Sequence, residues 1–258
     1  MSGYSLQLDA PNARGVLLLK MNTSRNGSRQ FFLALLVLLV VAWVSGEATQ
    51  WILRNRAQHL LADIQAINVD RSRWADVQPT MQRWSKWSST PRACTADSCD
   101  YRISIEQSLP RILVGNPNNG IGNWLPRLVD RTGLRSTAAR GGFTVEHGVV
   151  TAKWFGEQVT LPVADWEQTT GYIPYLSVLS GESSKFHVTL PGPKPLHPNR
   201  MVQPINNYLV VSFTPDEDPS EKAQLMDFRL TCITQLTPCH SEREILPEAW
   251  RMLQEKNR

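Results

Sequence analysis

The chain has 258 residues, of which 41% are hydrophobic and 19% charged, and its formal net charge at pH 7 is +4. That charge lies near the N-terminus: residues 1–56 hold six Lys or Arg and two Asp or Glu, whereas residues 57–258 hold 21 of each. A nucleic-acid-binding domain needs a basic face of its own, so no nucleic-acid partner is predicted. The roughly 200 residues after the basic part are enough for one domain with a hydrophobic core.

An apolar run, residues 31–44, contains fourteen side chains and none of them is polar. A helix of this length spans roughly 21 Å, less than a hydrocarbon core of about 30 Å. The membrane-compatible pattern continues beyond it, and Arg29 on one side and Arg54 on the other limit the segment. We therefore predict an uncleaved, single-pass transmembrane signal-anchor over residues 29–53, with the lipid bilayer as its partner.

Two other interpretations of this run remain open, a cleaved signal peptide and a buried core helix. Gly46 and Ala48 are small residues suited to a cleavage site, but the thirty residues before the run are long for a signal peptide. More basic residues precede the run than directly follow it, which predicts a cytoplasmic N-terminus and a C-terminal domain in the periplasm or secretory lumen. The four that precede it are Arg14, Lys20, Arg25 and Arg29.

Four segments follow from these patterns. We expect a disordered cytoplasmic tail at residues 1–28, the transmembrane anchor at 29–53, a membrane-proximal helical segment at 54–90 and a β-rich extracytoplasmic domain at 91–258. In the third segment, apolar residues at three- and four-residue steps predict an amphipathic helix continuous with the anchor. A second helix is predicted after Ser72, kinked or divided at Pro79.

The four cysteines all lie beyond the anchor and form two local pairs, Cys94 with Cys99 and Cys232 with Cys239. An even number of cysteines in an exported domain favours disulfides. The local pairs are preferred because each encloses residues that favour turns, although cross-pairing remains open. A zinc site is the alternative, but the spacings are loose for one, and no C-x-x-C motif indicates redox catalysis.

The remainder of the chain alternates in the manner of β-strands. Strands are predicted at residues 101–106, 111–114, 143–146, 149–155, 158–163, 172–178, 185–190, 208–213 and 224–234. A turn at His147 and Gly148 joins two of them in a hairpin. Residues 115–122 and the proline-rich residues 190–205 are expected to be loops, with a short helix near Trp124 and a C-terminal helix after Ser241.

Because strand follows strand with few helices between them, the sheets should be mainly antiparallel. The predicted fold class is α+β, with a sandwich-like or curved sheet. It is preceded by one transmembrane helix and amphipathic helices, and it ends in a helix.

The sharpest hint of chemistry is Asp216-Glu217-Asp218, which follows an apolar strand. An Asp-x-Asp at this place in an anchored chain resembles Golgi-type glycosyltransferases, which implies that Asp216 and Asp218 hold a divalent metal against a sugar diphosphate. The alternative is a solvated acidic turn between two hairpin strands. The signature motifs of hydrolases, metalloproteases and nucleotide-binding enzymes are missing, so no catalytic residue, cofactor or metal site is predicted.

Nine tryptophans are the other unusual feature of the composition. Trp74, Trp84 and Trp87 form a cluster that fits either a core or a surface for a protein or glycan partner. The histidines have no helical metal spacing and are read as ordinary surface or core residues. The sequence thus favours a non-catalytic, membrane-anchored binding or scaffolding module; the alternative is a glycan-active enzyme that uses Asp216 and Asp218.

Overall fold

The computed structural model describes residues 25–89, 94–107, 135–161, 175–185, 200–205, 208–234 and 239–256. The chain divides into two compact units, Met1–Ala42 and Trp43–Arg258, and helix α1 (Arg25–Ala66) belongs partly to each. The further elements are α2 (Trp74–Trp84), η1 (Ser85–Trp87), β1 (Ser98–Gln107), β2 (Thr137–Glu146), β3 (Val149–Thr160), β4 (Tyr175–Ser183), β5 (Arg200–Ile205), β6 (Tyr208–Phe213), α5 (Pro219–Leu225), η3 (Leu230–Ile233), α6 (Glu242–Ile245) and α7 (Pro247–Lys256).

The described part of the first unit is the N-terminal portion of α1. Its large apolar side chains are exposed: Phe31 is 68% and Leu38 is 66% accessible to solvent. Among the described residues one helical stretch, Arg29–Ala66, is long enough to cross a membrane and contains a segment that is apolar enough to do so. The predicted apolar helix is confirmed, and so is its continuation into an amphipathic helix; its topology stays a prediction.

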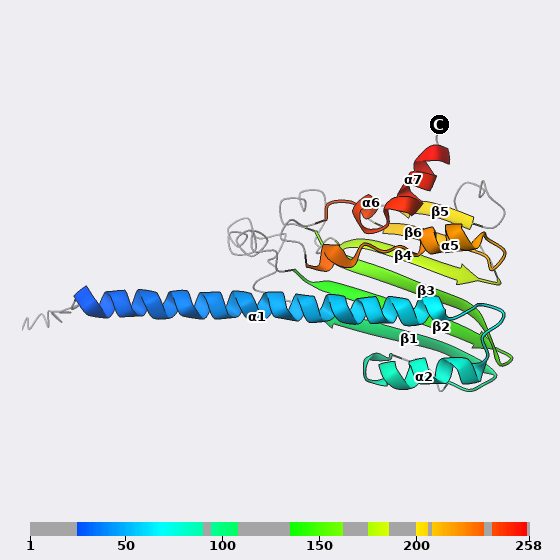
Figure 1. The fold of residues 1–258 in the computed structure, drawn as a ribbon, viewed down its shortest axis with the longest axis horizontal. Helices are drawn as coiled ribbons and strands as arrows, with labels where there is room; N and C mark the ends of the chain where they lie inside the picture. Colours follow the sequence, from blue (N-terminus) through cyan, green and yellow to red (C-terminus); the bar gives the residue numbers. More distant parts are fainter. Residues whose placement is uncertain are drawn as a thin grey trace, which may run out of the picture. The chain divides into compact units, whose positions relative to one another are not determined.

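The second unit contains one six-stranded sheet in the order β1-β2-β3-β4-β6-β5 (Figure 1). All neighbouring strands are antiparallel except β4 and β6, which are parallel. His147 and Gly148 connect β2 to β3 with φ angles of 51° and 79°, the positive values of a two-residue hairpin turn. The α+β class with a mainly antiparallel sheet is confirmed, and the described strands form a single sheet.

The core lies on one face of this sheet. Alternate residues of the strands point to it, including Ile103, Phe143 and Phe155, which are at most 1% exposed. From α1, Leu60 and Ile64 pack against the same face. Gly141 permits this close approach, because a Cβ atom at that position would lie 3.3 Å from Ile64 Cγ1 and 3.5 Å from Leu60 Cδ2. The helical segment after the apolar run therefore shares its core with the strands.

The strand predicted at residues 224–234 is wrong. Pro219–Leu225 forms α5 and Leu230–Ile233 forms η3, and the Arg229 amide donates to the Ile245 carbonyl rather than to a strand, at 2.8 Å. The alternating apolar side chains that suggested a strand are buried, but as part of the layer that covers the sheet. Alternation predicts burial on one side of the chain, and it does not decide what the backbone bonds to.

Two further predictions are corrected at the strands. Residues 149–155 and 158–163 are not separate strands, because β3 runs unbroken through Gly156 and Glu157 to Thr160. Arg200–Ile205, expected to be loop, is the edge strand β5, in which Pro204 pairs with Leu209. Proline is tolerated there because an edge strand has one side without a neighbour.

The helices also differ in detail from the prediction. Arg73 rather than Ser72 caps α2, and its amide donates to the Asp76 carboxylate at 2.7 Å. Pro79 lies within α2, which continues to Trp84. The C-terminal helix is confirmed but is divided into α6 and α7, which starts at Pro247.

Several predicted elements lie outside the described residues, wholly or largely. They are residues 1–24 of the tail, the strands 111–114 and 185–190, the loop 115–122 and the helix near Trp124. Residues 25–28, which were expected to be disordered, instead begin α1.

Candidate functional site

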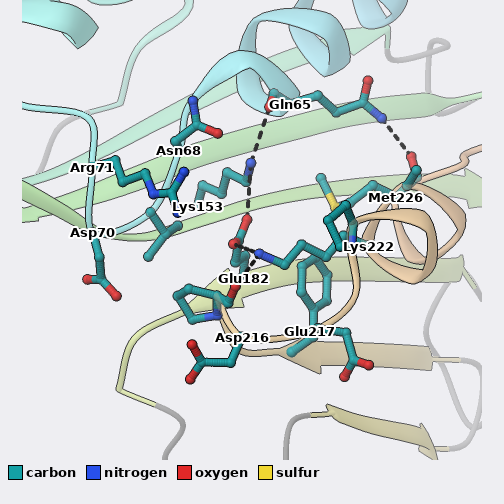
Figure 2. Close-up of a pocket in the computed structure, with 15 residues that line it drawn as sticks. Gln65, Asn68, Asp70, Arg71, Lys153, Glu182, Asp216, Glu217, Lys222 and Met226 are labelled. Atoms are coloured by element: carbon teal, nitrogen blue, oxygen red, sulfur yellow. Dashed lines mark hydrogen bonds and ion pairs between the residues drawn. The ribbon is translucent and has the colours of Figure 1, made fainter.

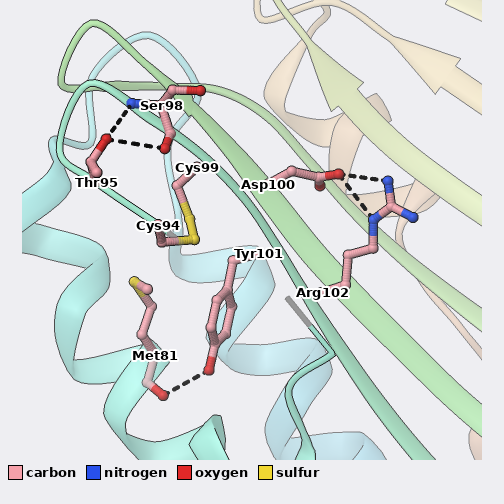
Figure 3. Close-up of a disulfide and its surroundings, with 8 residues drawn as sticks. All are labelled: Met81, Cys94, Thr95, Ser98, Cys99, Asp100, Tyr101 and Arg102. Atoms are coloured by element: carbon pink, nitrogen blue, oxygen red, sulfur yellow. Dashed lines mark hydrogen bonds and ion pairs between the residues drawn. A yellow bond between two sulfur atoms is a disulfide. The ribbon is translucent and has the colours of Figure 1, made fainter. Parts of the chain in front are cut away.

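The two disulfides join the local cysteine pairs. Cys94 and Cys99 are bonded across a Cα–Cα distance of 4.4 Å, and Cys232 and Cys239 across 5.6 Å. Figure 3 shows the first disulfide at the start of β1, where the Ser98 amide donates to Thr95 Oγ1 at 3.2 Å. All four cysteines are paired, so none of them is a free thiol.

A pocket of about 750 Å³ lies where the end of α1 meets the sheet and α5 (Figure 2). One wall is the turn after α1, the floor comes from β3 and β4, and the other wall is the turn after β6 together with α5. Nine of its fifteen lining residues are polar or charged: Gln65, Asn68, Asp70, Arg71, Lys153, Glu182, Asp216, Glu217 and Lys222. The volume falls in the range of pockets that bind small molecules, about 300–1,000 Å³.

Three charged side chains form the floor, and we call them the buried triad. Glu182 lies between two lysines: Lys153 Nζ is 3.1 Å from its Oε2 and Lys222 Nζ is 2.8 Å from its Oε1. The side chains of Lys153 and Glu182 are 8% and 6% exposed, and that of Lys222 is 23% exposed. Ion pairs are costly to bury unless further hydrogen bonds satisfy them, and here backbone carbonyls provide those bonds.

Lys153 supplies the end of α1 with a cation. Its Nζ donates to the carbonyls of Gln65, at 3.2 Å, and of Ile67. The last turn of α1 has no basic residue of its own, so a lysine from the sheet interacts with the negative end of the helix dipole. Burial lowers the pKa of Lys153, and the nearby Glu182 carboxylate opposes that shift.

Lys222 ties α5 to the turn that precedes it. Its Nζ donates to the Pro215 carbonyl at 2.6 Å as well as to Glu182. On the far side of the pocket, Gln65 Nε2 donates to the Met226 carbonyl at 3.0 Å. The pocket is thereby held open between walls that hydrogen bonds connect.

Sheet register explains why the charges meet. Lys153 pairs with Phe143 on one side and with Glu182 on the other, and Glu182 pairs with Phe213. The four side chains form one row across the core face, with two charges between two buried phenylalanines. A row at the end of the core can hold charges that a row at its centre would exclude, because carbonyl groups of the adjoining turns lie within reach.

Three exposed charged residues form the rim of the pocket, Asp70, Arg71 and Asp216. Within the described part of the chain none of these side chains has a hydrogen bond or ion pair. Asp70 has a φ of 63°, an uncommon value for a residue other than glycine, and its amide donates to the Val150 carbonyl at 2.9 Å. Such backbone positions are frequent at functional sites.

The two carboxylates singled out from the sequence have different surroundings. Asp216 lines the pocket. Asp218 caps α5: its Oδ1 accepts from the Ser220 hydroxyl at 2.5 Å and from the Ser220 amide at 2.8 Å, and these bonds lower its pKa. A helix rather than a second strand follows them, so the expected hairpin tip is wrong. Among the described residues no three His, Cys, Asp or Glu side chains are grouped to hold a metal ion.

The tryptophan cluster belongs to the core. Trp84 is 3% exposed and its Nε1 donates to Asp63 at 2.8 Å, while Trp74 and Trp87 pack against the core and are partly buried. The histidines form no constellation in the described chain; the imidazole of His147 is 91% exposed and lies 3.3 Å from Asp97.

Sequence reasoning missed the buried triad. The available signal was the phase of β3 and β4: Lys153 is in step with Phe155 and Val159, and Glu182 with Leu176 and Val178, so each occupies a core position. Comparison with known protein families, with curated proteins and with solved structures finds no match to this chain.

Proposed function

We propose that the chain is a single-pass, membrane-anchored protein whose extracytoplasmic domain binds a small polar ligand without catalysing a reaction. The observation that carries this proposal is the buried triad of Lys153, Glu182 and Lys222 at the floor of a pocket of about 750 Å³. Buried charges that line an open pocket are typical of ligand sites. The apolar helix and the two disulfides support membrane anchoring in an oxidising compartment.

Binding is favoured over catalysis because hydrogen bonds hold the charged groups of the triad in place. Each lysine donates to a carboxylate oxygen and to a backbone carbonyl. A proton-transfer group must be able to reach the substrate and change its protonation state, whereas fixed charges of this kind orient a ligand.

The test is a thermal-shift screen of the full chain in detergent against amino acids, sugars, nucleotides and carboxylic acids. At least one class should raise the melting temperature, because a ligand that binds only the folded state stabilises it. The shift should disappear in Lys222→Gln and persist in Arg140→Gln, which alters an exposed ion pair on the sheet. If no class shifts the melting temperature, the proposal is wrong.

A glycan-active enzyme is the second candidate, because Asp216 lines the pocket. If Asp216 and Asp218 bind a divalent metal, millimolar Mn²⁺ should raise the melting temperature of the wild type but not that of the Asp216→Asn, Asp218→Asn double variant. If Mn²⁺ changes the melting temperature of neither protein, the enzyme hypothesis is wrong and the proposal of a binding module is unaffected.

A further inference from the structure

We infer that the pocket binds a zwitterion, a molecule with one carboxylate and one ammonium group such as a free amino acid or a short peptide. This inference rests on the proposed function and names the class of its ligand. It follows from where the positive and negative charges of the pocket lie.

The floor of the pocket is cationic. The triad combines two lysines with one glutamate, which leaves one net positive charge. The ammonium group of Lys153 is used fully, because its three N–H bonds have three acceptors: Gln65 O, Ile67 O and Glu182. Lys222 has two acceptors within the described chain and is the more exposed of the two lysines, so one N–H bond remains for an anionic ligand group.

Two of the three rim residues are acidic, and they lie on opposite sides of the pocket. Asp70 belongs to the wall after α1 and Asp216 to the opposite wall, and neither carboxylate has a partner among the described residues. Arg71 lies beside Asp70 and provides a second cation, whose planar guanidinium suits a carboxylate. Figure 2 shows the carboxylates of Asp70 and Asp216 directed away from the triad, so that these two anionic groups are separated from the net positive charge of the floor.

This separation argues against ligands with charge of one sign. A simple anion held at Lys222 leaves the carboxylates of Asp70 and Asp216 without a counter-charge, and a simple cation held at the rim leaves the Lys222 donor unused. The lining carries three cations (Lys153, Lys222 and Arg71) and four anions (Asp70, Glu182, Asp216 and Glu217), so it is close to neutral in sum but polarised in space. A ligand with both charges matches both parts.

The experiment compares three peptides with one backbone on the full chain in detergent: alanyl-alanine, its N-acetyl form and its C-terminal amide. Isothermal titration should show that the zwitterion binds at least about tenfold more tightly than either blocked form, since each lost charge removes one charge-assisted contact. Alanine, titrated in the same way, tells whether the site takes a free amino acid or requires a peptide.

Three variants assign the charges. Arg71→Gln and Lys222→Gln should each reduce the preference for the zwitterionic peptide over its amide, which lacks the carboxylate. Asp216→Asn should reduce the preference for the zwitterionic peptide over its acetylated form, which lacks the ammonium group. Arg71 and Asp216 are exposed and bear no structural bonds, so these variants keep the test valid if Lys222→Gln fails to fold. Equal affinity for all three peptides, or a response to another ligand class only, overturns the inference while leaving the binding module intact. No response to any ligand in the wider screen overturns both.

Discussion

Lys153 shows how one side chain can connect three elements. It belongs to β3, pairs with Glu182 of β4 and donates to the carbonyls of Gln65 in the last turn of α1 and of Ile67 just after it. The side chain of Lys153 is only 8% exposed, and burying a charged ammonium group to this extent without such partners would be too costly. The partners therefore make the charge a structural link between the helix and the sheet.

Replacing this lysine should destabilise the domain strongly. Lys153→Met removes one cation from Glu182 and leaves the end of α1 without its donor, and breaking a buried pair from one side costs about 3–5 kcal/mol. Urea denaturation of the full chain in detergent should show this loss. The control is Arg140→Met, which breaks an ion pair to Glu106 in which both side chains are 48% exposed, and it should change stability by no more than about 0.5 kcal/mol.

The second prediction concerns Glu157 and the pH dependence of the stability of the fold. It is 1% exposed, neither carboxylate oxygen has a hydrogen bond within the described chain, and burial raises its pKa from an ordinary value of 4.5 to about 8, although Arg135 and Arg54 oppose the shift. Between these two values the folded chain keeps a proton that the unfolded chain has lost. Stability should therefore fall as the pH rises through this window, by up to about 1.4 kcal/mol per pH unit.

The substitution Glu157→Gln should flatten this slope in chemical denaturation measured from pH 5 to 8. Glu106→Gln is the matched control. A hydrogen bond from Ser104 lowers the pKa of Glu106, so the titration of Glu106 affects stability at pH values lower than those measured, and the slope from pH 5 to 8 should not change. A wild type whose stability rises from pH 5 to 8 would contradict the prediction.

At the scale of elements, the packing of α1 on the sheet depends on Gly141. The missing side chain of this residue leaves room for Ile64 and Leu60 of the helix. We expect Gly141→Val to destabilise the domain by about 1–3 kcal/mol, because the added methyl groups overpack the contact. Ser177→Val adds a branched side chain to β4 on the other face, half-buried, and should be nearly neutral in the same denaturation assay. Equal effects of the two substitutions would show that α1 does not pack as described.

Elements with a strong local pattern were predictable. The hairpin around His147 and Gly148, the strand Tyr208–Phe213 and the local disulfides all depend on residues close in sequence. The segment 224–234 misled because its apolar alternation is shared by strands and by an irregular layer packed on a sheet. Helix α5, which ends within this segment, does begin with residues that are typical of a helix start, Asp218 as the N-cap and Pro219 in the first turn.

The pocket could not be predicted in the same way. Lys153, Glu182 and Lys222 lie on three elements, and they meet only through the register of β3 with β4 and the position of α5. The parallel pairing of β4 with β6 is equally non-local, because β5 lies beyond β6 in the sheet although it precedes it in the chain. A single sequence shows that charged residues occupy core positions of the strands. It does not show the strand register that brings these residues together.

For the molecule as a whole, charge and cysteine placement bear on its location. Basic residues exceed acidic ones only in the first 56 residues, and all four cysteines, each in a disulfide, lie after them. Persistent disulfides are typical of oxidising compartments, whereas an excess of Lys and Arg is typical of the cytoplasmic side of a membrane helix. Both signals agree with an N-terminus in the cytoplasm and a domain outside it.

The corresponding prediction concerns topology. A reporter that is active only outside the cytoplasm, fused after Arg258, should be active, and the chain should stay with membranes after a carbonate wash because α1 is inserted rather than adsorbed. Replacing Lys20, Arg25 and Arg29 by Gln should lower the reporter activity, since it leaves only Arg14 before the apolar run against Arg54 and Arg56 after it. Lys86→Gln, Arg102→Gln and Arg140→Gln in the domain should not lower it. Release into the soluble fraction with a new N-terminus near Thr49 would instead show that the apolar run is a cleaved signal peptide, and an inactive reporter on a membrane-bound chain would show the opposite orientation.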